Sequence, residues 1–139
     1  EVTESAMMSD PEHALDTLNL FQSLGVDVAI DDFGTGYSSL SHLKRLPVNE
    51  IKIDRAFVKD MRRDKDDEVI VRSTIDLAHN LGLLVVAEGV EDVETLHLLA
   101  DLNCDLAQGY YFGRPFPAER LHLNGGQQPV RPILEVKRS

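Results

Sequence analysis

Polar side chains recur at the ends of short apolar runs in this sequence. The residues concerned are Glu1, Asp31, Asp32, Lys52, Glu88 and Gln108. Carboxylate and amide oxygens suit hard cations such as Mg²⁺ and Mn²⁺. A lysine beside such cations can orient a nucleophile and stabilise developing negative charge. This set therefore predicts phosphate chemistry assisted by metal ions, whereas the five histidines show no ligand spacing.

The apolar runs alternate with helical patterns along the chain. Strands are expected within residues 1–4, 26–31, 50–53, 83–87 and 106–112. Helices are expected over residues 11–24 and 39–46, from about residue 55, from the charged stretch 62–68 to residue 82, and over 93–102. Strands that alternate with helices predict a parallel sheet and an α/β fold. In such sheets, the carboxyl ends of the strands meet at one edge, where barrel enzymes place their active sites.

Side-chain alternation along the expected strands brings three of the polar residues together. Successive side chains of a strand point to opposite faces, so Asp31, Lys52 and Glu88 can share one cavity. Asp32 faces the other way on an ideal strand and joins them only if the turn at residues 33–34 swings it round.

The overall composition excludes some classes of function. The 139 residues carry a formal net charge of −10, which disfavours general binding of DNA or RNA because phosphate contacts require basic surfaces. Cations held between carboxylates and phosphate still allow a phosphate substrate. The single Cys104 cannot form an internal disulfide. With no apolar run near the length of a membrane span and no secretory leader, we expect a cytoplasmic location and no membrane contact from this segment, although a longer parent can carry an anchor.

Five ordered motifs identify a family resemblance. Residues 31–40 (DDFGTGYSSL) closely resemble a segment of EAL phosphodiesterase domains. Residues 1–4 resemble their E-[IVL]-T-E strand, residues 51–54 their K-I-D strand and residues 87–91 their A-E-G-V-E segment. Residues 108–115 resemble the closing Q-G-Y…P segment. The resemblance covers residues 1–122, as the C-terminal part of an EAL domain, and leaves residues 123–139 as a tail or linker.

The resemblance implies a (β/α)8 barrel of the TIM type with one antiparallel strand, of which this chain supplies about the last five strands. It also implies a two-metal site for Mg²⁺ or Mn²⁺, hydrolysis of cyclic di-GMP to linear pGpG, and a homodimer. In the family, the Glu-Ala-Leu segment and a strand with a metal-binding Asn precede the position of Glu1. We therefore expect the fragment alone to be inactive and to self-associate, and the intact domain to be the enzyme.

The resemblance assigns a role to each matching residue. The residues for the metal ions are Glu1, Asp31, Asp32 and Glu88. Lys52 contacts and orients the attacking water, Glu88 belongs to the catalytic set, and Gln108 lies in the pocket near that water. A flexible loop is coupled to metal binding and dimerisation through Glu4, Phe33, Gly34, Thr35, Gly36, Tyr37 and Ser38, with Glu91 at the same face.

Each assignment has a structural alternative. The Asp31-Asp32 pair can cap a helix, Lys52 can be an ion-pair partner of Asp31, and Glu88 can be an acid in a turn. The aromatic run 110–112 fits packing better than base stacking. A domain that senses cyclic di-GMP without cleaving it, and a dimerisation module, remain alternatives to the phosphodiesterase.

Overall fold

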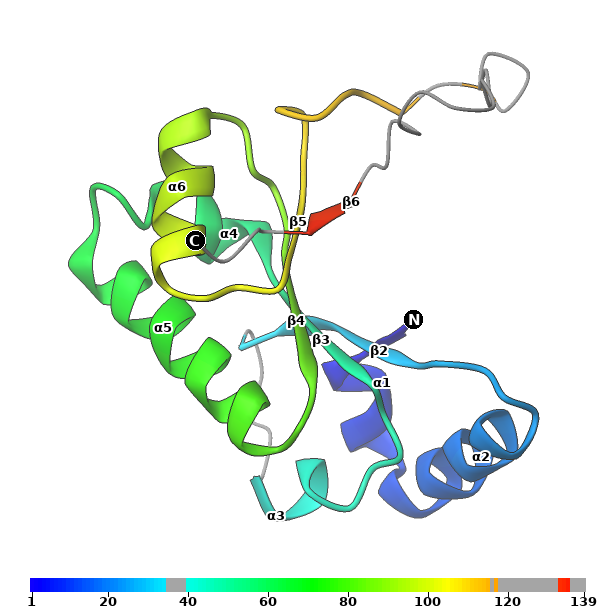
Figure 1. The fold of residues 1–139 in the computed structure, drawn as a ribbon. Coiled ribbons are helices and arrows are strands. Elements are labelled where there is room, and N and C mark those ends of the chain that lie inside the picture. Colours follow the sequence, from blue (N-terminus) through cyan, green and yellow to red (C-terminus); the bar gives the residue numbers. More distant parts are fainter. Residues whose placement is uncertain (35–39, 116, 118–132, 136–139) are drawn as a thin grey trace.

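A six-stranded sheet flanked by helices forms the protein (Figure 1). The computed structural model describes residues 1–34, 40–115, 117 and 133–135. The elements in chain order are β1 (Val2–Thr3), α1 (Glu4–Ser9), α2 (Pro11–Ser23), β2 (Ala29–Phe33), α3 (Leu40–Leu43), β3 (Glu50–Ile53), α4 (Arg55–Asp60), α5 (Lys65–Asn80), β4 (Leu84–Ala87), α6 (Val93–Asp101), β5 (Leu106–Gln108) and β6 (Ile133–Glu135). The strands lie in sequence order, from β1 at one edge to β6 at the other.

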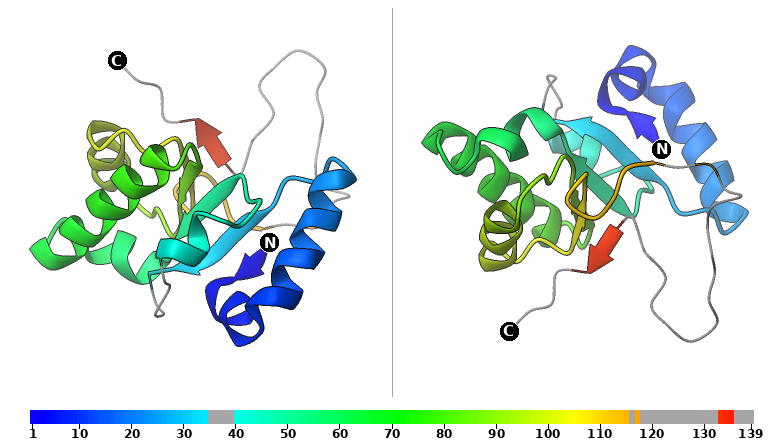
Figure 2. Two further views of the ribbon diagram at one scale, coloured as in Figure 1. Left: turned by 90° about the horizontal axis from the view of Figure 1, so that it is seen from below. Right: turned by 90° about the horizontal axis from the view of Figure 1, so that it is seen from above.

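The first five strands are parallel, as their alternation with helices predicts. Helices α4, α5 and α6 gather on one side of the sheet, where α5 contacts β3 and β4 (Figure 2). Helix α1 contacts β1 and β2 beside the first edge. No helix in the described part of the chain is both long and apolar enough to cross a bilayer.

Short polar side chains begin several of the helices. Asp10 accepts a hydrogen bond from the backbone N–H of His13 and precedes Pro11, which suits the first turn of α2. Asp54, Asp64 and Asp92 cap α4, α5 and α6 in the same manner. Each of these caps marks the residue at which the following helix begins.

The core lies on the face of the sheet that carries the apolar half of each strand. Ile30 pairs in register with Ile51, and Ile51 pairs with Val85; all three are fully buried. Burial of such side chains stabilises the fold by about 1.5–3 kcal/mol each. This core leaves the other face of the sheet for polar side chains.

The structure differs from the expected elements at both ends of the chain. The expectation of a strand through Glu4 is wrong, because Thr3 caps α1 and Glu4 lies in its first turn. Within the segment expected to be a tail, Ile133–Glu135 pair antiparallel with β5 as β6. Residues 123–132 and 136–139 of that segment lie outside the described residues.

Candidate active site

The strand register brings the predicted polar residues to one face of the sheet. In a parallel sheet, registered residues point to the same side. Thr3 is registered with Asp31 and Lys52 with Val86, which places Glu1, Asp31, Lys52 and Glu88 on a common face. The pairing of Val86 with Leu106 adds Gln108 to that face. The prediction that Asp31, Lys52 and Glu88 share one cavity therefore has its geometric basis in this register.

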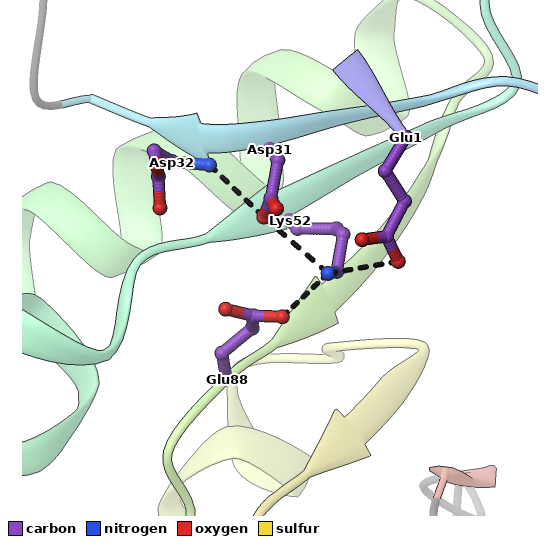
Figure 3. A network of polar contacts seen from close by, with 5 residues as sticks. All are labelled: Glu1, Asp31, Asp32, Lys52 and Glu88. Atoms are coloured by element: carbon purple, nitrogen blue, oxygen red, sulfur yellow. Dashed lines mark hydrogen bonds and ion pairs between the residues drawn. The ribbon is translucent and has the colours of Figure 1, made fainter. Parts of the chain in front are cut away.

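Three carboxylates converge on the ammonium group of Lys52 (Figure 3). The Nζ atom of Lys52 lies 2.6 Å from Glu88 Oε1, 3.0 Å from Glu1 Oε1 and 3.3 Å from Asp31 Oδ1. Glu1 precedes β1, Asp31 lies in β2 and Glu88 follows β4. Lys52 lies in β3, between β2 and β4 in the sheet. We refer to Glu1, Asp31, Lys52 and Glu88 as the Lys52 cluster.

The ammonium group is buried while its partners remain partly exposed. The side chain of Lys52 is 5% exposed, whereas those of Asp31 and Glu88 are 24% and 20% exposed and that of Glu1 is 60% exposed. Burial alone would lower the pKa of Lys52, but its hydrogen bonds with Glu88 and Glu1 and the charge of Asp31 raise this pKa overall. Lys52 is therefore a permanent cation at neutral pH, enclosed by acids that still have oxygens facing solvent.

A β-bulge places Asp32 beside the cluster. Ile30 is registered with Ile51 and Phe33 with Ile53, so two residues of β2 stand opposite the single Lys52 of β3. Asp32 adopts a left-handed φ of +56°, which is uncommon for a residue other than glycine. The turn expected at residues 33–34 thus begins earlier, at Asp32, and Gly34 also has a left-handed φ, of +97°. The role of Asp32 at the metal site stays a prediction.

The environment of Asp32 raises the pKa of its carboxyl group above the ordinary value. Burial raises the pKa of Asp32, and the charge of Asp31 and a hydrogen bond with Asp54 add to this effect, with Lys52 acting in the opposite direction. The backbone N–H of Asp32 donates to Asp31 Oδ1 over 3.1 Å. The two adjacent acids thus differ in environment: Asp31 faces the ammonium, and Asp32 faces another carboxyl group.

Glu4 connects the first helix to the start of the loop after β2. It is 2% exposed, and its Oε2 atom accepts a hydrogen bond from the backbone N–H of Gly34 over 3.0 Å. Phe33, the last residue of β2, is buried in the core. Four other predicted loop residues, Thr35, Gly36, Tyr37 and Ser38, lie outside the described residues. The expected pairing of Glu4 with this loop is therefore seen at Gly34.

Gln108 and Glu91 lie near the loop that follows β4. The backbone carbonyl of Gln108 accepts a hydrogen bond from Val90 N over 3.0 Å, so the ends of β4 and β5 are tied together. Glu91 is exposed and lines a polar hollow with Arg62 and Thr95, apart from the contacts of Lys52 described above. Their predicted roles in the pocket and at the dimer face remain predictions.

Close glycine packing around this loop was not expected from the sequence. A Cβ atom on Gly109 would lie 2.1 Å from the carbonyl oxygen of Val90, and one on Gly89 would lie 2.5 Å from Cβ of Arg55. The N–H of Tyr111 also donates to the Val90 carbonyl over 3.0 Å. The glycines that flank Glu88 and Gln108 were visible as a sequence signal, but their contacts depend on the neighbouring strand.

The aromatic residues after β5 do not all pack inward. Tyr110 and Tyr111 are 55% and 44% exposed, while Phe112 packs against the core. The ring of Tyr111 contacts that of Phe112 edge-on, with centroids 5.2 Å apart, as the packing interpretation predicts. The guanidinium of Arg114 stacks on the ring of Tyr110 at 5.0 Å from its centroid.

The donor atoms of the cluster fit Mg²⁺ or Mn²⁺ in kind. Both ions prefer oxygen ligands, and Glu1, Asp31, Asp32 and Glu88 offer carboxylates. Yet within the part of the chain that the structure describes, no three Asp, Glu, His or Cys side chains are arranged as a ready ligand set. The convergence point of the carboxylates is taken by the ammonium of Lys52. The residues thus fit the metal ions by chemistry, while their present spacing is set by an internal cation.

The protein has an α/β fold, and one face of its sheet carries a cluster of acids around a lysine. Comparison with known proteins shows the family to which the chain belongs. The family model described as the EAL domain matches residues 1–115. The chain belongs to the EAL domain family. Its five-stranded parallel sheet corresponds to part of the barrel of such domains, as the resemblance implied.

Related proteins are much longer than this chain. It is 49% identical over 121 residues to the bifunctional diguanylate cyclase/cyclic di-GMP phosphodiesterase MucR of Pseudomonas aeruginosa, covering 87% of this chain and 18% of MucR. It is 46% identical over 121 residues to the cyclic di-GMP phosphodiesterase NbdA of the same organism, covering 87% of this chain and 16% of NbdA. The chain thus spans less than a fifth of either relative.

Solved structures of EAL proteins share the fold. The c-di-GMP complex of the PaMucR phosphodiesterase superposes with a TM-score of 0.83 at 48% identity, covering 86% of this chain and 49% of that one. The manganese and cyclic di-GMP complex of BlrP1 from Klebsiella pneumoniae superposes with a TM-score of 0.76 at 38% identity, covering 82% of this chain and 29% of that one.

Proposed function

We propose that this chain forms part of a metal-dependent phosphodiesterase that hydrolyses cyclic di-GMP to linear pGpG. The observation that supports the proposal most strongly is the convergence of Glu1, Asp31 and Glu88 on Lys52 at the polar face of the sheet. Polar residues at the carboxyl ends of the strands of an α/β barrel are typical of active sites. The names of MucR and NbdA point to the same substrate and reaction.

The proposed metal site uses the carboxylates around Lys52. Glu1, Asp31, Asp32 and Glu88 would hold two cations, either Mg²⁺ or Mn²⁺. Such cations neutralise phosphate charge and lower the pKa of a bound water. The bulge in β2 supports a role for both adjacent acids, because it puts two carboxyl groups opposite one residue of β3.

The proposed reaction adds one water to one phosphodiester bond. The water oxygen forms a bond to phosphorus, the bond from phosphorus to the 3′ oxygen breaks, and a proton ends on that 3′ oxygen, so that the phosphate stays on the 5′ side of pGpG. Lys52 would orient the water and stabilise the charge that develops. Gln108, which shares the face of Lys52, would contact the substrate near that water.

The proposed dimer involves the segment after β2. Glu4 holds Gly34, the first residue of that segment after β2, through a buried carboxylate. This contact supports the proposal that Glu4 couples the loop to the site and to a second subunit, with Glu91 at the same face. Light scattering of the complete protein and its Glu4→Gln variant would test this, and equal masses at all concentrations would contradict it.

The proposal predicts hydrolysis that depends on both the metal ions and Asp31. The complete protein is incubated with cyclic di-GMP and Mg²⁺ or Mn²⁺, and pGpG is quantified by chromatography. Asp31→Asn keeps the side-chain size but removes the charge, and we expect a loss of about 100-fold or more in rate. Asp76→Asn is the matched control, since Asp76 is exposed on α5.

The outcomes distinguish the proposed enzyme from a binding domain. Formation of pGpG by the wild type and the Asp76 variant, with loss in the Asp31 variant, supports the phosphodiesterase. Tight binding of cyclic di-GMP with no pGpG under any metal condition would contradict it and favour a sensor. Equal rates for all three proteins would contradict the role of Asp31.

A further inference from the structure

The ammonium of Lys52 occupies the meeting point of acids from three strand segments. Its contacts with Glu88, Glu1 and Asp31 are 2.6, 3.0 and 3.3 Å long. An ammonium group has three N–H donors, which equals the number of carboxylates around it. The side chain of Lys52 is 5% exposed, so water supplies little of its solvation. Lys52 therefore depends on the three acids, and the acids are held together by Lys52.

The same contacts explain why the acids are not arranged as ligands. Mg²⁺ binds oxygens at about 2.0–2.1 Å and demands nearly octahedral geometry. The oxygens around Lys52 lie at 2.6–3.3 Å from a nitrogen, and no ready ligand set exists among the described residues. Acids gathered around an ammonium are close enough to be recruited by a cation but too far apart to bind one in place.

We infer that Lys52 is the resident cation of the metal-free site, and that a divalent cation must displace its ammonium from at least one of the three carboxylates. The inference deepens the proposed function and rests on it. In this account Lys52 has a second role beside orienting water: it preserves the cluster when no metal is bound and weakens metal binding by charge repulsion.

Removal of the positive charge of Lys52 should raise the affinity of the site for divalent cations. Replacing Lys52 by an uncharged side chain removes a positive charge within a few ångströms of an entering cation, and it leaves three carboxylates facing one another. Like charges at such distances repel strongly in a partly buried site. The uncharged variant should therefore bind divalent cations more tightly and be less stable without them. Tighter metal binding on removal of Lys52 tests the charge repulsion, and movement of its ammonium when metal binds tests the displacement.

The test compares metal binding by three forms of the complete protein. Mn²⁺ alone is titrated into the wild type, Lys52→Met and Arg72→Met, and free Mn²⁺ is followed by electron paramagnetic resonance. Arg72 is a matched control because it removes the same charge from an exposed ion pair with Glu68 on α5. We expect Lys52→Met to bind Mn²⁺ roughly tenfold or more tightly than the wild type, and Arg72→Met to match the wild type.

Thermal unfolding gives a second reading of the same variants. Without metal, Lys52→Met should melt below the wild type, and Mn²⁺ should raise its melting temperature by more than it raises that of the wild type. Equal or weaker Mn²⁺ binding by Lys52→Met, with normal binding by the wild type, would overturn the inference and leave the proposed function standing. No binding by the wild type would contradict the proposed metal site and the inference with it.

A measurement on the wild type avoids any risk that Lys52→Met fails to fold. The Nζ resonance of Lys52 is followed by NMR correlation to Cε while Mg²⁺ is added. Displacement of the ammonium should shift this resonance, while the exposed Lys44, Lys59 and Lys65 stay unchanged. A Lys52 resonance that does not move while Mg²⁺ binds would overturn the inference.

Discussion

At the amino ends of the strands, Asn49 and Asp105 accept hydrogen bonds from backbone N–H groups, whereas at the polar face the acids of the Lys52 cluster turn toward one ammonium. Asn49 Oδ1 accepts from Val28 N and Asp105 Oδ2 from Val85 N, both over 3.0 Å. Asp105 also contacts His79 Nε2 at 2.8 Å. Asn49 and Asp105 complete the backbone hydrogen bonds of the sheet. The acids of the Lys52 cluster instead collect negative charge around a side chain.

Carboxylates thus have two different uses in this protein: some stabilise the fold, and others gather at the candidate active site. A carboxylate that satisfies a buried N–H stabilises the fold, because an unsatisfied buried donor costs about 1–3 kcal/mol. Carboxylates that surround a cation repel one another and depend on that cation, which is typical of functional sites. In α/β barrels, these two uses are commonly divided between the two ends of the strands.

The largest expected effect concerns Glu88. Glu88→Gln should lower the rate of cyclic di-GMP hydrolysis by about 100-fold or more, because it removes the carboxylate nearest to Lys52 and a proposed metal ligand. Lys52 keeps Glu1 and Asp31, so the loss of folding stability should be smaller than for Asp105→Ala. The measurements are the hydrolysis rate with Mg²⁺ and denaturant unfolding; a large loss of stability with normal hydrolysis would contradict the separation of roles.

A smaller loss of hydrolysis is expected from a substitution at Gly109, which packs against the loop that follows Glu88. Gly109→Ala would drive a methyl group into the backbone of Val90, so the loop after Glu88 must move. A displacement of about 1 Å at a reacting group can cost up to about 100-fold in rate, and we expect a loss between tenfold and that limit. Hydrolysis rate and Mn²⁺ affinity should fall together. Normal values for both in a folded variant would show that the Val90 contact does not position Glu88.

Loss of Asp105, the carboxylate at the amino end of β5, should lower folding stability and leave hydrolysis unchanged. Asp105→Ala leaves the N–H of the buried Val85 without its acceptor and removes the partner of His79, so the free energy of unfolding should fall by about 1–3 kcal/mol. The hydrolysis rate per folded molecule should be unchanged. Asp76→Ala, at an exposed position of α5, serves as the control. A drop in hydrolysis by fully folded Asp105→Ala would place Asp105 in the functional group.

The smallest expected effect is an alkaline loss of stability from Cys104, which precedes Asp105. Burial raises the pKa of this thiol from 9.0 to about 12, although hydrogen bonding at the Leu106 carbonyl opposes the shift. Because the folded pKa exceeds the unfolded one, the stability is complete below pH 9 and is lost as the pH rises toward 12. By pH 10 the free energy of unfolding should have fallen by about 1.4 kcal/mol.

The control for this loss is Cys104→Ala. Other groups titrate at alkaline pH in both proteins, so the difference in slope between the wild type and the variant isolates the thiol. Equal slopes above pH 9 would show that Cys104 is not in the dry environment that its 1% exposure describes.

The general fold and the position of the site could be predicted from the sequence. Alternation of apolar strands with helices indicates parallel pairing, and that pairing aligns Asp31, Lys52 and Glu88 through local periodicity alone. The start of α2 also has a sequence signature, because Asp10 stands directly before Pro11 and caps that helix. These features depend on neighbours in the sequence, or on one rule for all parallel sheets.

The remaining features depend on contacts between distant segments. The bulge at Asp32 arises because β2 and β3 differ by one residue between their paired positions, and no local pattern shows that mismatch. The two-residue β1 ends where Thr3 begins to cap α1, so capping prevails over strand propensity at Glu4. The pairing of β6 with β5 requires a segment about 25 residues away to meet an open sheet edge.

The most direct test of the central claim is a crystal structure of the complete protein with Mn²⁺ and cyclic di-GMP, with the ions located by their anomalous scattering. We expect manganese peaks bonded to carboxylate oxygens from Glu1, Asp31, Asp32 and Glu88, with the ammonium of Lys52 moved from the centre of the cluster. Cyclic di-GMP bound with manganese elsewhere, and Lys52 still enclosed by Glu1, Asp31 and Glu88, would contradict it.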